Sequence, residues 1–213
     1  MPDLSTCQLY FIADYRPGIN RHCLPDMVSR AIAGGADIIQ LRYKNSERNE
    51  LLQAAERVIR ITSSQEIPLI INDDPEVALE VGAAGVHLGQ VDMPIERARE
   101  LLGKDKIIGL STHSVEEAIE AEEKGADYIG IGPIFYTTTK QPVRTPLETE
   151  ILQQLSTAVK IPFYPIGGLN ADNIDLILTP AARRAAVASC IGEAHDIKQS
   201  AQQLKSKLTA VII

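Results

Sequence analysis

The chain has 213 residues, 45% of them hydrophobic, and a formal net charge of −7, which is typical of a soluble globular protein with one sizeable core. The negative charge argues against a nucleic-acid or membrane partner, so any phosphate site must be a local cluster of cations. The three scattered cysteines, Cys7, Cys23 and Cys190, show no metal-ligand spacing, and we find neither a signal peptide nor an apolar stretch near the ~20 residues that span a bilayer, so we expect a cytoplasmic protein.

Short apolar runs alternate along the chain with longer stretches of helical period. The runs lack strict apolar/polar alternation, which is typical of parallel strands buried on both faces. We expect strands at Gln8–Ala13, Asp37–Leu41, Ile67–Ile71, Gly85–Leu88, Lys106–Leu110, Tyr128–Ile131, Ile161–Ile166 and Ala185–Ala188. We expect helices at Leu24–Ala33, Glu47–Thr62, Pro75–Val81, Pro94–Leu102, Val115–Lys124, Leu147–Ala158, Ala171–Leu178 and Ile197–Leu208.

Several of these helices have good start signals. Asp74 stands before a proline, as an N-cap residue does before a first-turn proline. Ser114 and Glu117 have the spacing of a capping box. Asn170 and Asp172 are suitable residues to open the seventh helix.

A weak internal repeat also supports the alternation. The segments Gly35–Asp37, Gly82–Ala84 and Gly125–Asp127 each end a predicted helix and lead into a strand, with glycine in the usual C-terminal capping place. Eight strand–helix units predict an α/β fold, a (β/α)8 TIM barrel, as a single domain over residues 1–213. The alternative is an open doubly wound sheet, which needs a glycine-rich turn after the first strand, where the chain instead reads Asp14–Gly18.

Polar residues follow nearly every predicted strand, at the end where barrel enzymes carry their active sites. Gln40, Arg42 and Lys44 alternate along one such end, so a period of two points all three to the same side. The other members of this set are Asn72, Asp73, Gly89, Gln90, Asp92, Ser111, Thr112, His113, Thr137–Lys140, Gly167, Gly168 and Ser189.

Each of these motifs also has a purely structural reading. Asn72–Asp74 could be an N-cap cluster, Gly167–Gly168 a tight turn and Thr137–Thr139 a solvated loop. His87 is more often a satisfied core or rim histidine than a ligand. Their joint placement favours the functional reading, because the structural readings are independent of one another.

Two anion sites follow from the residue types. Asp73 and Asp92 end neighbouring strands, and two carboxylates suit Mg²⁺, which takes oxygen ligands from the protein and from substrate phosphates. Arg42, Lys44 and Lys140 could then neutralise a diphosphate.

The second site lies after the last two strands, where barrels often bind a phosphate through backbone N–H groups. Gly167–Gly168 and the backbone around Ser189 stand there. A diphosphate ester reacting with a phosphorylated acceptor, with diphosphate as the leaving group, is the reaction that two such sites suggest.

At these residues the chain resembles the thiamine-phosphate synthase (thiamine-phosphate pyrophosphorylase) family over nearly its whole length. The most specific stretches are Ile39–Lys44, Ile70–Asp73, Ala83–Pro94, Ile108–Glu117, Gly125–Lys140 and Ile166–Leu169. The resemblance implies a transferase that joins a pyrimidine diphosphate to a thiazole phosphate, giving thiamine phosphate and diphosphate. It leaves the oligomeric state open, a homodimer included.

The resemblance also implies roles for single residues. Asp73 and Asp92 would hold Mg²⁺. Ser111, Lys140 and Arg42 would act at the reacting centre. The pyrimidine diphosphate would be bound by Gln40, Arg42, Lys44, Asn72, Ser111 and Lys140, and the thiazole phosphate by Thr137, Thr139, Gly168, Ala188 and Ser189. The implied mechanism is dissociative, so it needs charge stabilisation and positioning and no nucleophilic side chain.

The chain departs from the family pattern in three places and leaves two alternatives. Tyr136 stands where proline is common. Asp74 stands where the family often has arginine, and Arg183 and Arg184 stand where small residues are usual. One alternative is a TenI-like thiazole tautomerase on the same barrel, which would use a histidine at the position of His113 and typically lacks the metal carboxylates. The other is a non-catalytic regulator that binds the same phosphate ligands.

Overall fold

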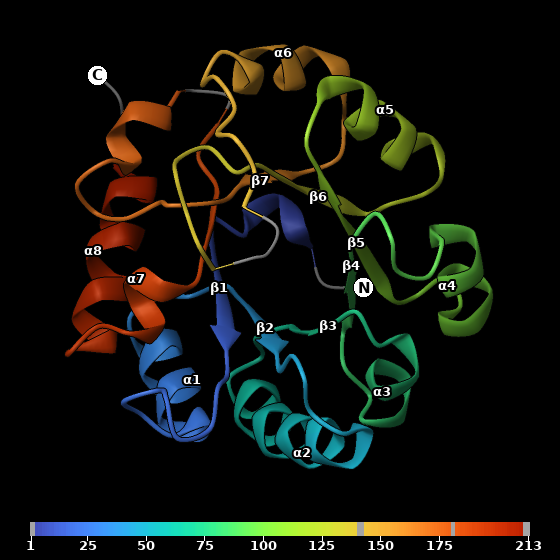
Figure 1. Ribbon diagram of the computed structural model, residues 1–213, viewed down its shortest axis with the longest axis vertical. Helices are drawn as coiled ribbons and strands as arrows, with labels where there is room; N and C mark the ends of the chain where they lie inside the picture. Colours follow the sequence, from blue (N-terminus) through green and yellow to red (C-terminus); the bar gives the residue numbers. More distant parts are fainter. Residues whose placement is uncertain (1–2, 140–142, 180–181, 211–213) are drawn as a thin grey trace.

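The eight predicted strands form one parallel sheet that curls into a barrel, drawn in Figure 1 as a computed structural model. They are β1 Leu9–Asp14, β2 Ile38–Arg42, β3 Leu69–Asn72, β4 Gly85–Leu88, β5 Ile107–Thr112, β6 Tyr128–Ile131, β7 Phe163–Pro165 and β8 Ala185–Val187. The strands pair in the order β7-β6-β5-β4-β3-β2-β1-β8, and a parallel bridge between Ile166 and Ala186 joins the two ends of the sheet. The predicted (β/α)8 barrel is confirmed.

The structure describes residues 3–139, 143–179 and 182–210. Helices surround the barrel (Figure 1): α1 Leu24–Ala33, α2 Arg48–Ser64, α3 Pro75–Glu80, α4 Ile95–Leu102, α5 Val115–Glu123, α6 Ile151–Ala158, α7 Ser189–Gly192 and α8 Ile197–Thr209. Two short 3-10 helices, η1 Leu4–Thr6 and η2 Ile174–Ile177, complete the set. Within the described ranges, every helix is too short or too polar to cross a membrane.

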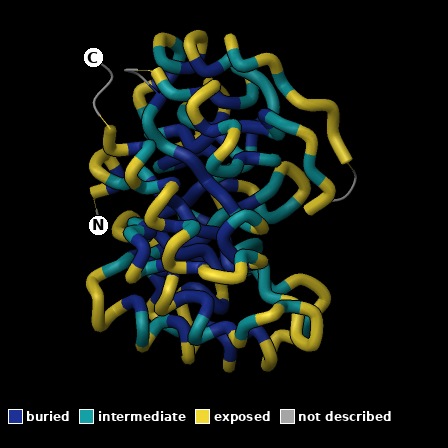
Figure 2. The backbone as a smooth tube through the Cα atoms, turned by 90° about the vertical axis from the view of Figure 1, so that its left-hand side faces the viewer, coloured by how far each residue is buried: buried dark blue, intermediate teal, exposed yellow. Residues whose placement is uncertain are grey.

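The side chains of each strand divide between two apolar layers. In β1, Leu9, Phe11 and Ala13 pack in the layer between the strands and the helices. Tyr10 and Ile12 belong to a second cluster inside the barrel, which also contains Leu4 of η1. Figure 2 shows the resulting pattern, a buried centre with exposed residues at the periphery. Burial of both strand faces explains why the strand sequences are apolar runs without alternation.

The repeated glycine motif has the structural role that its position predicted. Gly35, Gly82 and Gly125 follow the ends of α1, α3 and α5 with φ of 100°, 69° and 89°, a region that glycine enters without steric penalty. After each glycine, the next backbone N–H reaches back to a helix carbonyl, as in Ala126 to Ala121 at 2.9 Å. These are Schellman-type ends, which turn the chain from a helix into the following strand.

Two predicted helices differ from the structure. The segment predicted as the helix Ala171–Leu178 contains only the 3-10 turn η2. The side chain of Asn170 accepts from the backbone of Asn173 at 3.2 Å, and that of Asn173 accepts from the backbone of Asn170 at 2.9 Å. Such local hydrogen bonds compete with helix formation. The sixth helix begins at Ile151 and not at Leu147, whose N–H donates to the Pro133 carbonyl at 2.7 Å.

The capping predictions are confirmed in one place and corrected in another. Asp74 caps α3, with its carboxylate accepting from the Val77 N–H at 2.8 Å. Ser114 caps α5 by accepting from the Glu117 N–H at 3.1 Å. The predicted capping box is incomplete. The Glu117 carboxylate accepts from the backbone N–H of His113 at 2.8 Å and not from the N–H of the cap residue Ser114.

Candidate active site

The two carboxylates predicted to hold a metal lie beside each other at the ends of β3 and β4. Asp73 has φ of 66°, a conformation that aspartate tolerates better than most residues, and its N–H donates to the His87 carbonyl at 2.8 Å. Asp92 is held by a turn, in which its carboxylate accepts from the Gly89 N–H at 2.7 Å. Burial raises the pKa of the Asp73 carboxyl, a hydrogen bond from Lys44 lowers it, and the neighbouring Asp92 raises it again.

This pair fits a Mg²⁺ site with two protein ligands. The carboxylates repel each other, and Lys44, which forms an ion pair with Asp73, supplies a counter-charge. Among the described residues, no group of three or more His, Cys, Asp or Glu side chains is arranged to hold a metal. Mg²⁺ typically takes one or two carboxylates and completes its shell with water and substrate phosphates, so the donor set is sufficient.

The predicted cation Arg42 is held by a residue that the sequence analysis missed. Asp14, at the end of β1, is aligned with Arg42 of β2 in the sheet register and forms an ion pair with its guanidinium. Both side chains are largely buried, with exposed fractions of 10% for Asp14 and 17% for Arg42. The only sequence signal for Asp14 was its place directly after the first apolar run.

Gln40 and Ser111 lie at the two ends of a path of hydrogen-bonded side chains, with Gln40 buried inside the barrel and Ser111 partly exposed. Gln40 is 2% exposed, and its amide nitrogen donates to the Tyr10 hydroxyl at 2.7 Å. The Ser111 hydroxyl contacts His87 Nε2 at 3.0 Å, and the Ser111 carbonyl accepts from the Gln90 amide at 2.7 Å. Both ring nitrogens of His87 thus have hydrogen-bond partners, as expected of a satisfied core or rim histidine.

Three residues predicted for the second anion site line one small cavity. Thr139, Ala188 and Ser189 share its wall with Asp14, Arg16, Asn20, Gly192 and Glu193. Arg16 was not predicted; its guanidinium pairs with Glu193 at 2.5 Å. Ser189 is the first residue of the short helix α7 that follows β8.

Thr137 and Gly168 stand near residues of this cavity, whereas Asn72 lies at the end of another strand. The Thr137 and Thr139 hydroxyls are 3.1 Å apart. Gly168 and Ala188 each lie two residues after a member of the bridge between Ile166 and Ala186. Gly168 has φ of 63°, and a Cβ there would stand 2.5 Å from the Tyr136 carbonyl oxygen, so a larger residue would displace this loop. Asn72 ends β3, level with His87. Lys140 lies outside the described residues.

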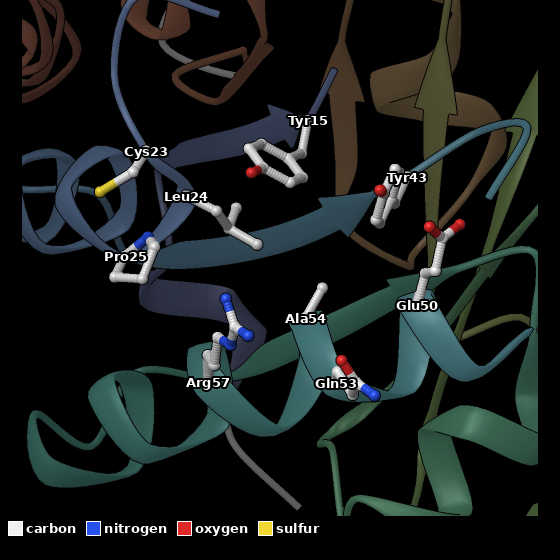
Figure 3. Close-up of a pocket in the computed structure, with 9 residues that line it drawn as sticks. All are labelled: Tyr15, Cys23, Leu24, Pro25, Tyr43, Glu50, Gln53, Ala54 and Arg57. Atoms are coloured by element: carbon white, nitrogen blue, oxygen red, sulfur yellow. The ribbon is translucent and has the colours of Figure 1, made fainter. Parts of the chain in front are cut away.

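A larger cavity, of about 220 Å³, opens outside the barrel between α1 and α2 (Figure 3). Tyr15 and Tyr43 form one wall, with ring centroids 5.2 Å apart at 74°. Arg57 and Glu50 of α2 lie on the other side. Of the residues predicted for the two anion sites, those that the structure describes lie outside the lining of this cavity.

A (β/α)8 barrel with carboxylates and cations at the carboxyl ends of its strands has the layout of an enzyme that acts on phosphate esters. The profile of the family described as thiamine monophosphate synthase matches residues 9–191. The chain belongs to this family.

Individual relatives agree with this assignment. The chain is 48% identical to a thiamine-phosphate synthase of Halalkalibacterium halodurans over 82% of this chain and 83% of that one. It is 43% identical to a thiamine-phosphate synthase of Shouchella clausii over 92% and 94% of the two chains. Among solved structures, thiamine phosphate pyrophosphorylase from Pyrococcus furiosus superimposes with a TM-score of 0.84 at 36% identity, covering 95% of both chains.

Proposed function

We propose that the protein joins 4-amino-2-methyl-5-hydroxymethylpyrimidine diphosphate to 4-methyl-5-(2-phosphoethyl)thiazole, producing thiamine phosphate and diphosphate. The observation that carries the proposal is the neighbouring pair of carboxylates, Asp73 and Asp92, with Lys44 against it, in a member of the thiamine monophosphate synthase family. Mg²⁺ is typically held by one or two protein carboxylates together with substrate phosphates, so this pair suits a diphosphate bound through a divalent ion.

The first substrate would be held at the ends of β2 to β5. Asp73 and Asp92 would hold Mg²⁺, which when bound would screen the negative charge of the diphosphate. Arg42 and Lys44 would add positive charge, and Lys140, which lies outside the described residues, would be a third cation. Gln40, Asn72 and Ser111 would orient the pyrimidine end.

The second substrate would be held after β6 to β8. Thr137 and Thr139 would offer hydroxyl groups to the thiazole phosphate, and Gly168, Ala188 and Ser189 would offer backbone N–H groups. The shared cavity wall of Thr139, Ala188 and Ser189 supports this part of the proposal.

The reaction would break the bond between the pyrimidine methylene carbon and the diphosphate oxygen, which keeps the electron pair. The cation left on the methylene group would be stabilised by the pyrimidine ring. The thiazole nitrogen would then use its lone pair to form the new carbon–nitrogen bond, and the positive charge would remain on the thiazolium ring. No proton has to be removed, so the protein's task is to stabilise the leaving group and to align the two substrates.

Incubating the purified protein with both precursors and Mg²⁺ tests the proposal. Thiamine phosphate and diphosphate should form in equal amounts, formation should stop on addition of a chelator, and excess Mg²⁺ should restore it. Each precursor alone is the control. A folded protein that forms no thiamine phosphate under these conditions would contradict the proposal, and isomerisation of the thiazole phosphate alone would identify a tautomerase.

The features that favoured a non-catalytic regulator have structural explanations. Asp74 caps α3. Arg183 donates to the Leu208 carbonyl at the end of α8 at 3.0 Å, and Arg184 donates to the Ser5 carbonyl at 2.7 Å. These contacts account for the unusual residues without a regulatory ligand.

We further propose that the protein works in the cytoplasm on small-molecule substrates, without a nucleic-acid or membrane partner. The formal net charge of −7 and the three free cysteines support this view.

A further inference from the structure

A chain of hydrogen bonds crosses the inside of the barrel and joins two of the predicted site residues. Gln40 Nε2 of β2 donates to the Tyr10 hydroxyl of β1 at 2.7 Å. The Tyr10 and Tyr128 hydroxyls lie 2.7 Å apart. The Tyr128 hydroxyl of β6 lies 2.9 Å from His87 Nδ1 of β4, and His87 Nε2 lies 3.0 Å from the Ser111 hydroxyl of β5.

The two tyrosines in the middle of this chain are buried and neutral. Tyr10 and Tyr128 are each 1% exposed, and their ring centroids are 5.7 Å apart. Burial raises the pKa of both phenols well above the ordinary value. Each therefore keeps one proton, which needs an acceptor because an unsatisfied buried donor is destabilising.

These constraints fix which group donates and which accepts at each step of the hydrogen-bond path. Tyr10 accepts from the Gln40 amide, so its own proton goes to Tyr128. The Tyr128 hydroxyl, having accepted that bond, donates to His87 Nδ1. A neutral imidazole that accepts at Nδ1 carries its proton on Nε2, which faces the Ser111 hydroxyl. Ser111 accepts this bond, and its own proton can point towards a ligand in the barrel mouth.

We propose that Tyr10, Tyr128 and His87 are positioning residues, which orient the Ser111 hydroxyl so that it donates to an acceptor atom of the diphosphate substrate. This inference rests on the proposed function for the identity of that substrate. The donor and acceptor roles along the hydrogen-bond path do not depend on the proposed function, because they follow from the hydrogen bonds of the protein alone.

The tautomer of His87 provides a test that needs no activity. Nitrogen-15 NMR of labelled protein should show His87 with its proton on Nε2. Tyr128→Phe removes the hydroxyl and keeps the ring, so it should abolish this preference. Tyr164→Phe is the matched control: its ring lies 5.6 Å from that of Tyr128, but its hydroxyl donates to the Cys7 carbonyl, outside the chain. A wild-type proton on Nδ1, or an unchanged tautomer in Tyr128→Phe, would overturn the proposal.

Kinetics provide the second test. Tyr128→Phe should lower kcat about tenfold with less than about a threefold change in KM, the effect of one misdirected hydrogen bond. In a Ser111→Ala background the same substitution should change kcat less than about twofold, because the two residues act through one contact. An undiminished effect in that background, or an equal loss in Tyr164→Phe, would contradict a positioning role. A wild type that makes no thiamine phosphate would refute the proposed function, and the NMR result would still decide the donor and acceptor roles along the hydrogen-bond path.

Discussion

Charged residues at the mouth of the barrel are held by one another as much as by the backbone. Asp73 lies between Lys44 and Asp92, and Arg42 is paired with Asp14. Such pairs keep side chains in place before a ligand arrives, which reduces the ordering needed on binding. Substituting one member therefore affects its partner as well, and a test of a single role must preserve the remaining contacts.

Asp92→Asn is such a substitution. The amide oxygen can still accept from the Gly89 N–H, so the turn should remain folded. Loss of the charge should weaken Mg²⁺ binding and lower Mg²⁺-dependent turnover by more than about a hundredfold, as removal of a direct ligand does. Turnover and the melting temperature should be measured together. Asp175→Asn, at an exposed aspartate that pairs with Lys207, is the control. Full turnover in Asp92→Asn would remove Asp92 from the metal site.

The cysteines should differ in reactivity because the thiolate is the reactive form. Burial raises the pKa of Cys190 to about 12, so at pH 8 its thiol is almost wholly protonated and reacts slowly. Cys23 is exposed. A thiol reagent should therefore label Cys23 rapidly in the native protein. Cys23→Ser should abolish this fast phase of labelling. Rapid labelling of Cys190 at pH 8 would show that its site opens.

At the scale of elements, the aspartates of the repeated motif connect each strand to its neighbour. Asp37, just before β2, accepts from the Leu9 N–H of β1 at 2.8 Å. Asp127, just before β6, accepts from the Ile108 N–H of β5 at 2.7 Å. The third copy has Ala84 in this place and keeps only the backbone bond to the Leu69 carbonyl, at 2.8 Å. The repeat is thus a repeated way of joining parallel strands at their amino-terminal ends.

Asp74→Ala should destabilise the protein by about 1 kcal/mol, because it removes the side-chain cap of α3. Asp74→Ser, which can still accept from the Val77 N–H, should recover most of this loss. Urea denaturation of the three proteins would measure the difference. Equal stability of Asp74→Ala and the wild type would show that the cap contributes nothing.

At the scale of the whole molecule, the first and last parts of the chain close the amino-terminal end of the barrel together. The Gln8 amide donates to the Leu208 carbonyl of α8 at 3.1 Å, and Lys205 of α8 pairs with Asp37 at 2.7 Å. Arg184 reaches Ser5, with its Nε buried and without a hydrogen-bond partner in the described structure. These contacts hold α8 and η1 against the amino-terminal ends of β1, β2 and β8.

Asp37→Ala should be the more damaging of two aspartate substitutions in ion pairs. It would leave the Gln8 and Leu9 N–H groups without their acceptor and would remove the carboxylate that pairs with Lys205. We expect it to destabilise the protein by about 2–4 kcal/mol. Asp175→Ala, in an exposed pair with Lys207, should change stability by less than about 1 kcal/mol. Chemical denaturation would measure the free energy of unfolding of both variants. Equal losses of stability would contradict a special role for Asp37.

Features that depend on neighbouring residues could be read from the sequence. The strands, most helix bounds, the Asp74 cap and the glycines after α1, α3 and α5 all follow from periodicity and turn chemistry within a few residues. The positions of Asp73 and Asp92 at neighbouring strand ends followed from the barrel hypothesis, because parallel strands present their carboxyl ends together. The helix Ala171–Leu178 was wrong because side chains of Asn170 and Asn173 bind the backbone that a helix would have used.

Contacts between side chains of distant residues came from the tertiary structure alone. The tertiary structure pairs Arg42 with Asp14. It also forms the path from Gln40 through Tyr10, Tyr128 and His87 to Ser111, which joins residues on different strands. They depend on the register of the sheet and on closure of the barrel, which together set which side chains meet inside it. The period of two along a strand determines that a side chain points into the barrel. Only the closed sheet determines which other side chain it contacts there.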